Sequence, residues 1–215
     1  NKRCKDLHVP APPFVFVTTD VFNADGTPVL HQHEQARSWT RNLYNLLAGT
    51  LLPAPSDTDP LSVGYGPGSL KIKAYNGAVT NYWEKKGVYT DAVIADVVGK
   101  STYYYQGISI GTGTSAASIE DYCLESPVGN GTGPGQMTRD DGVYASITYN
   151  AETKKWTAVY YRDFNNNSGG TITIGETGLG RKLTANTTTD NFVERNVLAS
   201  PVAVADGQTI RVTYT

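Results

Sequence analysis

Residues 142–215 constrain the fold most, because they consist of short alternating segments separated by turns. The segments 142–149 and 155–161 flank the five residues Asn150-Ala-Glu-Thr-Lys154 and predict a β-hairpin. Apolar and polar residues alternate in 171–179, so Ile172 and Ile174 are expected to share one face of a half-buried antiparallel strand. Further strands are expected at 192–198, 202–204 and 208–214, with breaks at 163–170 and Ser200-Pro201 and a turn at Asp206-Gly207.

The composition also favours sheets over helices. The chain has 14 Tyr and 22 Gly but a single Met, which suits strands joined by turns. Its 215 residues fit one all-β domain. We therefore predict a mainly β protein, an antiparallel β-sandwich or jelly-roll-like domain over 14–215, with an extended proline-rich N-terminal arm at 1–13 and an irregular insertion near 76–106.

The first half of the chain adds further strands and one helix. Strands are expected at 14–22, 29–33 and 70–75. The segment 107–115 predicts a strand that runs into a Gly/Thr loop, and a helical turn with a capping box is expected within 118–125. The only convincing helix covers 35–48, where apolar residues recur at three and four positions: Ala36, Trp39, Leu43, Leu46 and Leu47.

The apolar stripe of this helix has two interpretations. In the first, the helix covers one open end or face of the sandwich, with Trp39 as its anchor. In the second, the stripe docks on a neighbouring subunit, which makes Trp39, Leu43, Leu46 and Leu47 candidate interface residues.

Charge and hydropathy exclude two classes of partner. The formal net charge is −2 and only 18% of residues are charged, so no basic patch for nucleic acid is expected. No apolar run reaches the length of about 18 residues that a membrane-spanning helix needs. We expect neither nucleic acid nor a membrane as partner.

Several short motifs resemble ligand sites but lack essential residues. Gly111-Thr-Gly-Thr-Ser115 lacks the Lys of a phosphate-binding loop and is better read as a turn at a sheet edge. His31 and His33 would point the same way from a strand, but no third ligand is placed near them by the sequence. Asn23-Ala-Asp-Gly26 lacks the spacing and closing Glu of a calcium loop and predicts a hairpin turn. No metal and no cofactor are expected.

The acidic pairs do not form a catalytic pattern. Asp57/Asp59 and Asp140/Asp141 could in principle serve glycoside hydrolysis, but they lie in segments rich in Gly and Pro, where Asp is typical of turns. No Gly-x-Ser-x-Gly elbow accompanies the three histidines. The sequence therefore predicts no enzymatic activity. The two cysteines, Cys4 and Cys123, are expected to be unpaired thiols more readily than a disulfide.

A second function class rests on clustered aromatic residues. Tyr82 and Trp83, with Tyr103, Tyr104 and Tyr105, could stack on sugar rings. The alternative to a structural role is therefore a carbohydrate-binding adhesin or receptor-binding module.

Four segments of the sequence together resemble virion structural proteins of tailed bacteriophages. They are Arg37-Ser-Trp-Thr-Arg-Asn-Leu-Tyr-Asn-Leu-Leu47, Ile110-Gly-Thr-Gly-Thr114 with the segment 120–127, the segment 164–179, and the segment 198–214. The resemblance implies a helix followed by a β-sandwich, and it brings no catalytic residues.

The resemblance also implies a function and a location. It implies a non-enzymatic component of a phage virion, made in the host bacterial cytoplasm and acting as a capsid decoration or auxiliary protein or as a neck or tail protein. The expected partners are further copies of the chain and other virion proteins, such as the major capsid protein or neck and tail proteins.

Overall fold

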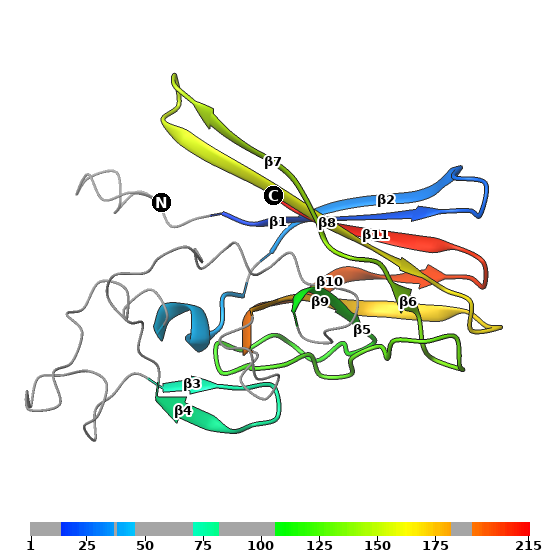
Figure 1. The fold of residues 1–215 in the computed structure, drawn as a ribbon, viewed down its shortest axis with the longest axis horizontal. Helices are drawn as coiled ribbons and strands as arrows, with labels where there is room; N and C mark the ends of the chain where they lie inside the picture. Colours follow the sequence, from blue (N-terminus) through cyan, green and yellow to red (C-terminus); the bar gives the residue numbers. More distant parts are fainter. Residues whose placement is uncertain (1–13, 37, 46–70, 82–105, 182–190) are drawn as a thin grey trace, which may run out of the picture.

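The computed structural model describes residues 14–36, 38–45, 71–81, 106–181 and 191–215. Two antiparallel sheets face each other as the layers of a β-sandwich, and a separate small hairpin lies at one end (Figure 1). The predicted fold class is confirmed. The predicted arm at 1–13 lies outside the described residues, as does most of the predicted insertion.

The larger sheet has the strand order β2-β1-β11-β8-β6, with β7 also pairing with β8. Its central strands β1 and β11 alternate buried and less buried residues, because one face packs on the core and the other faces outward. The bounds are β1 Phe16–Phe22, β2 Pro28–Gln35, β6 Thr138–Arg139, β7 Val143–Asn150, β8 Lys155–Asn165 and β11 Thr209–Tyr214.

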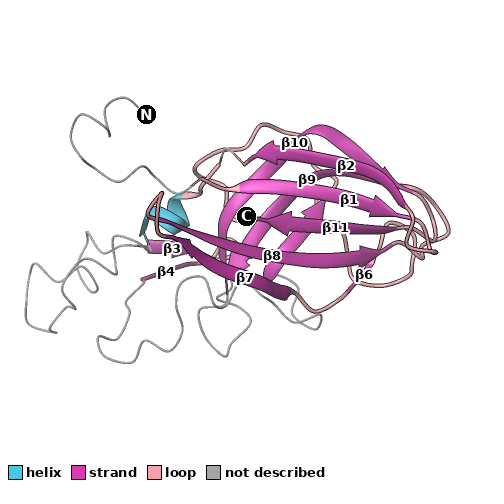
Figure 2. Ribbon diagram, turned by 90° about the horizontal axis from the view of Figure 1, so that it is seen from above, coloured by secondary structure: helices cyan, strands magenta, loops and turns pink. Residues whose placement is uncertain are grey.

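The smaller sheet has the order β10-β9-β5 and covers the inner face of the larger one (Figure 2). Its strands are β5 Gly107–Gly111, β9 Ile172–Arg181 and β10 Asn191–Val204, and the separate hairpin consists of β3 Lys71–Lys73 and β4 Val79–Asn81. The core lies between the sheets, with Val212 and Tyr214 from one layer and Ile174 and Val202 from the other. As predicted, Ile172 and Ile174 are both buried while Thr173 is exposed.

The helix is shorter than predicted at its start. Gln35 ends β2, and helical structure begins only at residue 41 and continues to 45, where the described part ends. Residues 38–40 are extended because they bond to β10: Thr40 N–H donates to Val193 O at 3.1 Å, and Arg195 N–H donates to Ser38 O at 3.2 Å. This long-range pairing overrides the local helical spacing.

The two predicted breaks differ from the structure in extent. The break predicted at 163–170 begins only at residue 166, because β8 continues through Asp163 to Asn165. Asp163 forms a two-pronged ion pair with Arg211 of the neighbouring strand, with Nε–Oδ1 and Nη2–Oδ2 distances of 2.7 Å. The Ser200-Pro201 break is an irregularity within β10, between Val197 and Val202.

Two predicted turns between strands are confirmed. The loop of the β7–β8 hairpin is confirmed but shorter than predicted, because Asn150 pairs with Lys155. The turn at Asp206-Gly207 is confirmed, and Gly207 has the positive φ that it needs. In 118–125 Asp121 Oδ2 accepts Ser118 N–H and Ser118 Oγ accepts Glu120 N–H, but the chain there makes a turn and no helix. Within 107–115 the predicted strand is β5, and the predicted loop follows it from Thr112, whereas the strand predicted at 70–75 is the short β3.

Candidate functional site

A buried carboxylate, Glu176 on β9, organises the loop that follows β5. Its side chain is 0% exposed. Oε1 accepts hydrogen bonds from the N–H groups of Gly113 at 3.2 Å and Ser126 at 2.8 Å, and Oε2 accepts from Glu125 N–H at 3.1 Å and Arg195 Nε at 2.7 Å. Four donors therefore satisfy both oxygens of this buried anion.

Arg195 on β10 completes the cluster. Its side chain is 3% exposed, and Nη1 donates to Asp121 Oδ2 at 2.8 Å while Nη2 donates to Ser115 O at 3.2 Å. Burial disfavours its charge, but the hydrogen bonds with Asp121 and Glu176 outweigh burial and raise the pKa of the guanidinium. The cluster fastens residues 112–127 to the smaller sheet and is internally satisfied, so its role is structural.

Glu194, next to Arg195, points into the core from the opposite face of β10. Tyr214 Oη donates to its Oε2 at 2.7 Å, and Thr177 Oγ1 lies 2.9 Å from the same phenol oxygen. Its Oε1 has no hydrogen-bond partner among the described residues. Burial raises the pKa of Glu194 to about 8, despite the opposing hydrogen bond from Tyr214. The carboxyl is therefore protonated near neutral pH.

Arg162 fixes the base of the β7–β8 hairpin. It is fully buried on β8, where Nε donates to Asp140 O at 2.7 Å and Nη1 donates to Gln106 O at 2.9 Å and Ile108 O at 3.0 Å. Burial, with Arg139 nearby, lowers the pKa of Arg162 to about 10. The side chain thus joins β8, the start of β5 and the residues before β7.

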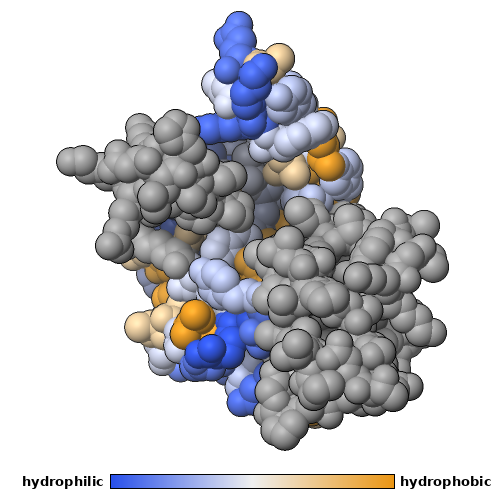
Figure 3. All heavy atoms as spheres, turned by 90° about the vertical axis from the view of Figure 1, so that its left-hand side faces the viewer, coloured by the Kyte–Doolittle hydropathy of each residue, from blue (hydrophilic) through white to orange (hydrophobic). Residues whose placement is uncertain are grey.

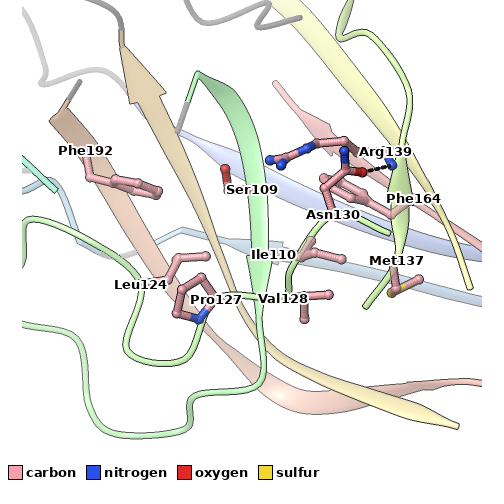
Figure 4. Close-up of a pocket in the computed structure, with 10 residues that line it drawn as sticks. All are labelled: Ser109, Ile110, Leu124, Pro127, Val128, Asn130, Met137, Arg139, Phe164 and Phe192. Atoms are coloured by element: carbon pink, nitrogen blue, oxygen red, sulfur yellow. Dashed lines mark hydrogen bonds between the residues drawn. The ribbon is translucent and has the colours of Figure 1, made fainter. Parts of the chain in front are cut away.

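A small cavity lies beneath β5 (Figure 4). Its volume of about 10 Å³ is enough for about one water molecule and far too small for an ordinary ligand. Asn130 Oδ1 at its rim accepts a hydrogen bond from Arg139 N–H at 3.2 Å. The lining residues are Ser109, Ile110, Leu124, Pro127, Val128, Asn130, Met137, Arg139, Phe164 and Phe192.

The two strand histidines are exposed and each contacts β1. His31 Nδ1 lies 2.6 Å from Asp20 Oδ1, and His33 Nδ1 lies 2.8 Å from Thr18 Oγ1. His33 also stacks on Phe16, with ring centroids 5.3 Å apart. Within the described ranges, no group of three His, Cys, Asp or Glu side chains is placed to hold a metal ion.

The other predicted motifs form turns and loop contacts. Asp25 Oδ1 accepts Thr27 N–H at 2.8 Å, which closes the turn between β1 and β2 and lowers the pKa of Asp25. In the Gly111–Ser115 segment, Gly113 lies so close to the side chains of Glu125 and Glu176 that no Cβ would fit without a shift. Cys123 is a partly buried free thiol, whereas Cys4, Asp57 and Asp59 lie outside the described residues.

The predicted interface residues divide into two groups. Leu43 is buried in the core and Trp39 is partly buried against it, as in the interpretation in which this segment covers the sandwich. Leu46 and Leu47 lie outside the described residues. All five residues of the predicted glycan-stacking cluster also lie outside them: Tyr82, Trp83, Tyr103, Tyr104 and Tyr105.

The β7–β8 hairpin extends past the smaller sheet (Figure 1). It carries an exposed apolar face. Cross-strand pairing sets Tyr149 opposite Trp156 and Tyr144 opposite Tyr160. The ring centroids of these pairs are 5.0 and 5.2 Å apart. Trp156 is 71% exposed. We call Tyr144, Ile147, Tyr149 and Trp156 the hairpin face.

The hairpin face continues the core-facing side of β8. Residues 156, 158 and 160 alternate along this strand, and beyond them Arg162 and Phe164 are buried in the sandwich. The same side of the strand is therefore core inside the sandwich and surface on the hairpin. Seen from the left of Figure 1, the charged tip is a hydrophilic projection, with pale and orange surface below it (Figure 3).

Sequence reasoning predicted this hairpin but missed its exposed face. The alternation of Tyr and Ile in β7 is the same signal that a buried strand would give. Nothing local indicates that the smaller sheet ends before the hairpin does. Glu176 and Arg195 were missed as well, although charged residues inside otherwise apolar strands are the signal that could have found them.

These features define a β-sandwich protein with a projecting aromatic hairpin. Comparison of the chain with protein-family models, with curated proteins and with solved structures gives no match. No helix within the described residues has the length and apolar character needed to cross a lipid bilayer.

Proposed function

We propose that the protein is a non-enzymatic structural component of a phage virion that assembles through protein–protein contacts, as a capsid decoration or auxiliary protein or as a neck or tail protein. The observation that carries this proposal is the hairpin face, an apolar surface that projects from the sandwich without cover from the described residues. The resemblance of the sequence to virion proteins is the reason for proposing a phage virion as the assembly.

The chemistry of the hairpin face suits contact with protein. Exposed apolar patches mark interaction sites, and aromatic residues are enriched at the centres of protein interfaces. Tyr149 and Trp156 supply large rigid rings, and Ile147 adds an aliphatic side chain between them and Tyr144. Burial of these side chains by a partner would remove the cost of leaving them in water.

Carbohydrate binding is the alternative, and Trp156 beside Tyr149 is the observation that favours it, since such rings stack on sugars. We place it second because the hairpin also offers an open backbone edge, which a protein strand can use and a sugar does not need. Binding to a glycan array that is lost in Trp156→Ala, with the fold intact, would favour this alternative.

Quantitative mass spectrometry of purified particles tests the proposal. Phage particles purified from a host that carries the gene for this chain should contain the chain. A copy number like that of the major capsid protein would indicate a capsid position, and a much lower one a neck or tail position. Incorporation of Trp156→Ala should fall, whereas Ile119→Ala, which alters an exposed apolar residue in a loop, should be incorporated normally. Absence of the chain from particles would overturn the proposal.

A further inference from the structure

Most open strand edges of this fold are protected. At the outer edge of the smaller sheet, β10 bonds to residues 38–40, and at its other edge Ile110 O of β5 accepts Val128 N–H at 3.0 Å. In the larger sheet, β2 begins at Pro28, carries the charged Glu34 and has an irregular register at its start. Proline, charge and irregularity are the features that keep edge strands from pairing with other chains.

The outer edge of β7 lacks these protections. Its sequence, Val-Tyr-Ala-Ser-Ile-Thr-Tyr-Asn, contains neither a charged residue nor a proline. Among the described strands β7 pairs only with β8, and its one irregularity lies at its base, between Tyr144 and Ser146. The regular stretch 146–150 therefore presents backbone groups with no strand partner among the described residues, beside the exposed hairpin face.

We infer that β7 pairs antiparallel with β7 of a second copy of this chain, so that the two larger sheets become one. This inference rests on the assembly role proposed above and names the partner of the same surface. The regular stretch is centred on Thr148, which would lie opposite Thr148 of the second copy. Ile147 would then lie opposite Tyr149 of the second copy, and the reverse pair would form by two-fold symmetry.

The side chains suit this register. Directly opposite residues of antiparallel strands share a face, so the two Ile–Tyr pairs would join the two hairpin faces into one apolar surface. Pairs of an aromatic with a β-branched side chain, and pairs of threonines, are among those that stabilise sheets. Each backbone edge would also gain hydrogen-bond partners that it lacks among the described residues.

The charges at the two ends of β7 are complementary. Just before the strand, at its base, Asp140 and Asp141 outnumber Arg139, and just after it, at the tip, Lys154 and Lys155 outnumber Glu152. Antiparallel pairing sets the base of one hairpin beside the tip of the other, so carboxylates of one copy would approach ammonium groups of the second. Parallel pairing would instead bring together groups of like charge. The charges therefore favour the antiparallel arrangement.

The hairpin is already ordered for such pairing. Asn150 Oδ1 accepts the N–H groups of Glu152 and Thr153, each at 2.9 Å, which closes the tip. Arg162 holds the base through its bond to Asp140 O. A partner would therefore bind a formed strand and would not have to order it, which favours association.

Analytical ultracentrifugation of the whole chain tests the inference. The wild type should form dimers in a concentration-dependent manner. Ile147→Lys should weaken dimerisation by at least about tenfold, because it would place a charged side chain within the joined apolar surface, opposite Tyr149 of the second copy. The matched control is Val29→Lys: both side chains lie on edge strands of the larger sheet, and they are 51% and 53% exposed. Val29→Lys should dimerise as the wild type does.

Oxidative cross-linking tests the register. Thr148→Cys should form a disulfide between two copies, because the two cysteines would face each other across the symmetry axis. Ser146→Cys should not, because its two copies would lie about 13 Å apart along the strands, beyond the reach of a disulfide. The unsubstituted chain reports any cross-linking through the native cysteines. Equal cross-linking of both variants would overturn the register.

Three outcomes separate this inference from the proposed function. A chain that is monomeric at every concentration but present in particles would overturn the inference, since another virion protein would then cover the hairpin, and would leave the proposed function intact. A dimer abolished by Ile147→Lys, in a chain absent from particles, would support the inference and overturn the virion role. An open series of oligomers would overturn the closed two-fold pairing.

Discussion

The buried carboxyl of Glu194 makes the stability of the protein depend on pH in a direction that can be worked out. Its pKa is about 8 in the folded protein against an ordinary value of 4.5. Between these values the folded chain holds a proton that the unfolded chain releases, so the free energy of unfolding falls as the pH rises. At about 1.4 kcal/mol per pH unit, the loss attributable to this group reaches at most about 5 kcal/mol by pH 8.

Glu194→Gln isolates this effect. The amide cannot ionise, but its oxygen can still accept the hydrogen bond from Tyr214. Urea denaturation of both proteins at a series of pH values from about 5 to about 8 gives the free energy of unfolding of each. We expect the free energy of unfolding of the variant, minus that of the wild type, to increase by several kcal/mol as the pH rises over this range. Glu120→Gln, which alters an exposed carboxylate, should not produce such a movement.

Parallel stability curves for the wild type and Glu194→Gln would refute this reasoning. They would mean that the carboxyl ionises in the folded protein as easily as in the unfolded chain. An absolute offset at the acidic end would not refute it, because the amide N–H groups would occupy the position where Oε1 has no partner among the described residues. The test therefore reads the change of the difference with pH and not its value at one pH.

Three further substitutions test other parts of the structure by denaturant unfolding. Glu176→Ala leaves a buried guanidinium and three N–H groups without their acceptor and should cost about 3–5 kcal/mol, while Glu120→Ala at an exposed ion pair should leave the midpoint unchanged. Gly113→Ala would force a Cβ against Glu125 and Glu176 and should cost about 1–3 kcal/mol, so an unchanged midpoint would contradict the packing of this loop. Lys154→Gly should raise stability by up to about 1 kcal/mol because Lys154 has φ 55, whereas Lys155→Gly, on the strand, should lower it.

The parts of the fold that the sequence predicted are those determined by neighbouring residues. Alternation placed Ile172 and Ile174 in the core, and Asp-Gly located the turn at 206–207, because both signals act over a few positions. The predicted start of the helix was wrong because Trp39 pairs with Glu194 on a distant strand. That contact is formed by tertiary structure and leaves no local signal.

The Glu176–Arg195 cluster and the hairpin face depend on such distant contacts even more than the strands and turns do. Glu176 and Arg195 meet only because β9 and β10 are neighbours, and their other partners come from the loop after β5. The exposure of Trp156 depends on how far the opposite sheet extends, which no local pattern encodes. Apolar alternation alone cannot distinguish a strand face that is covered from one that is left open.

Because β8 belongs both to the hairpin and to the wall of the core, it also determines how the molecule bears a load. A force that pulls the hairpin outward along β8 acts on the segment Tyr160–Asn165, which pairs with β11 from Thr209 to Tyr214. The hydrogen bonds of that ladder lie across the direction of pull, so they are strained together in shear and are not opened one after another. β11 passes the load to β1. The mechanical strength of an attachment through the hairpin is thus that of the sandwich and not that of a two-stranded ribbon.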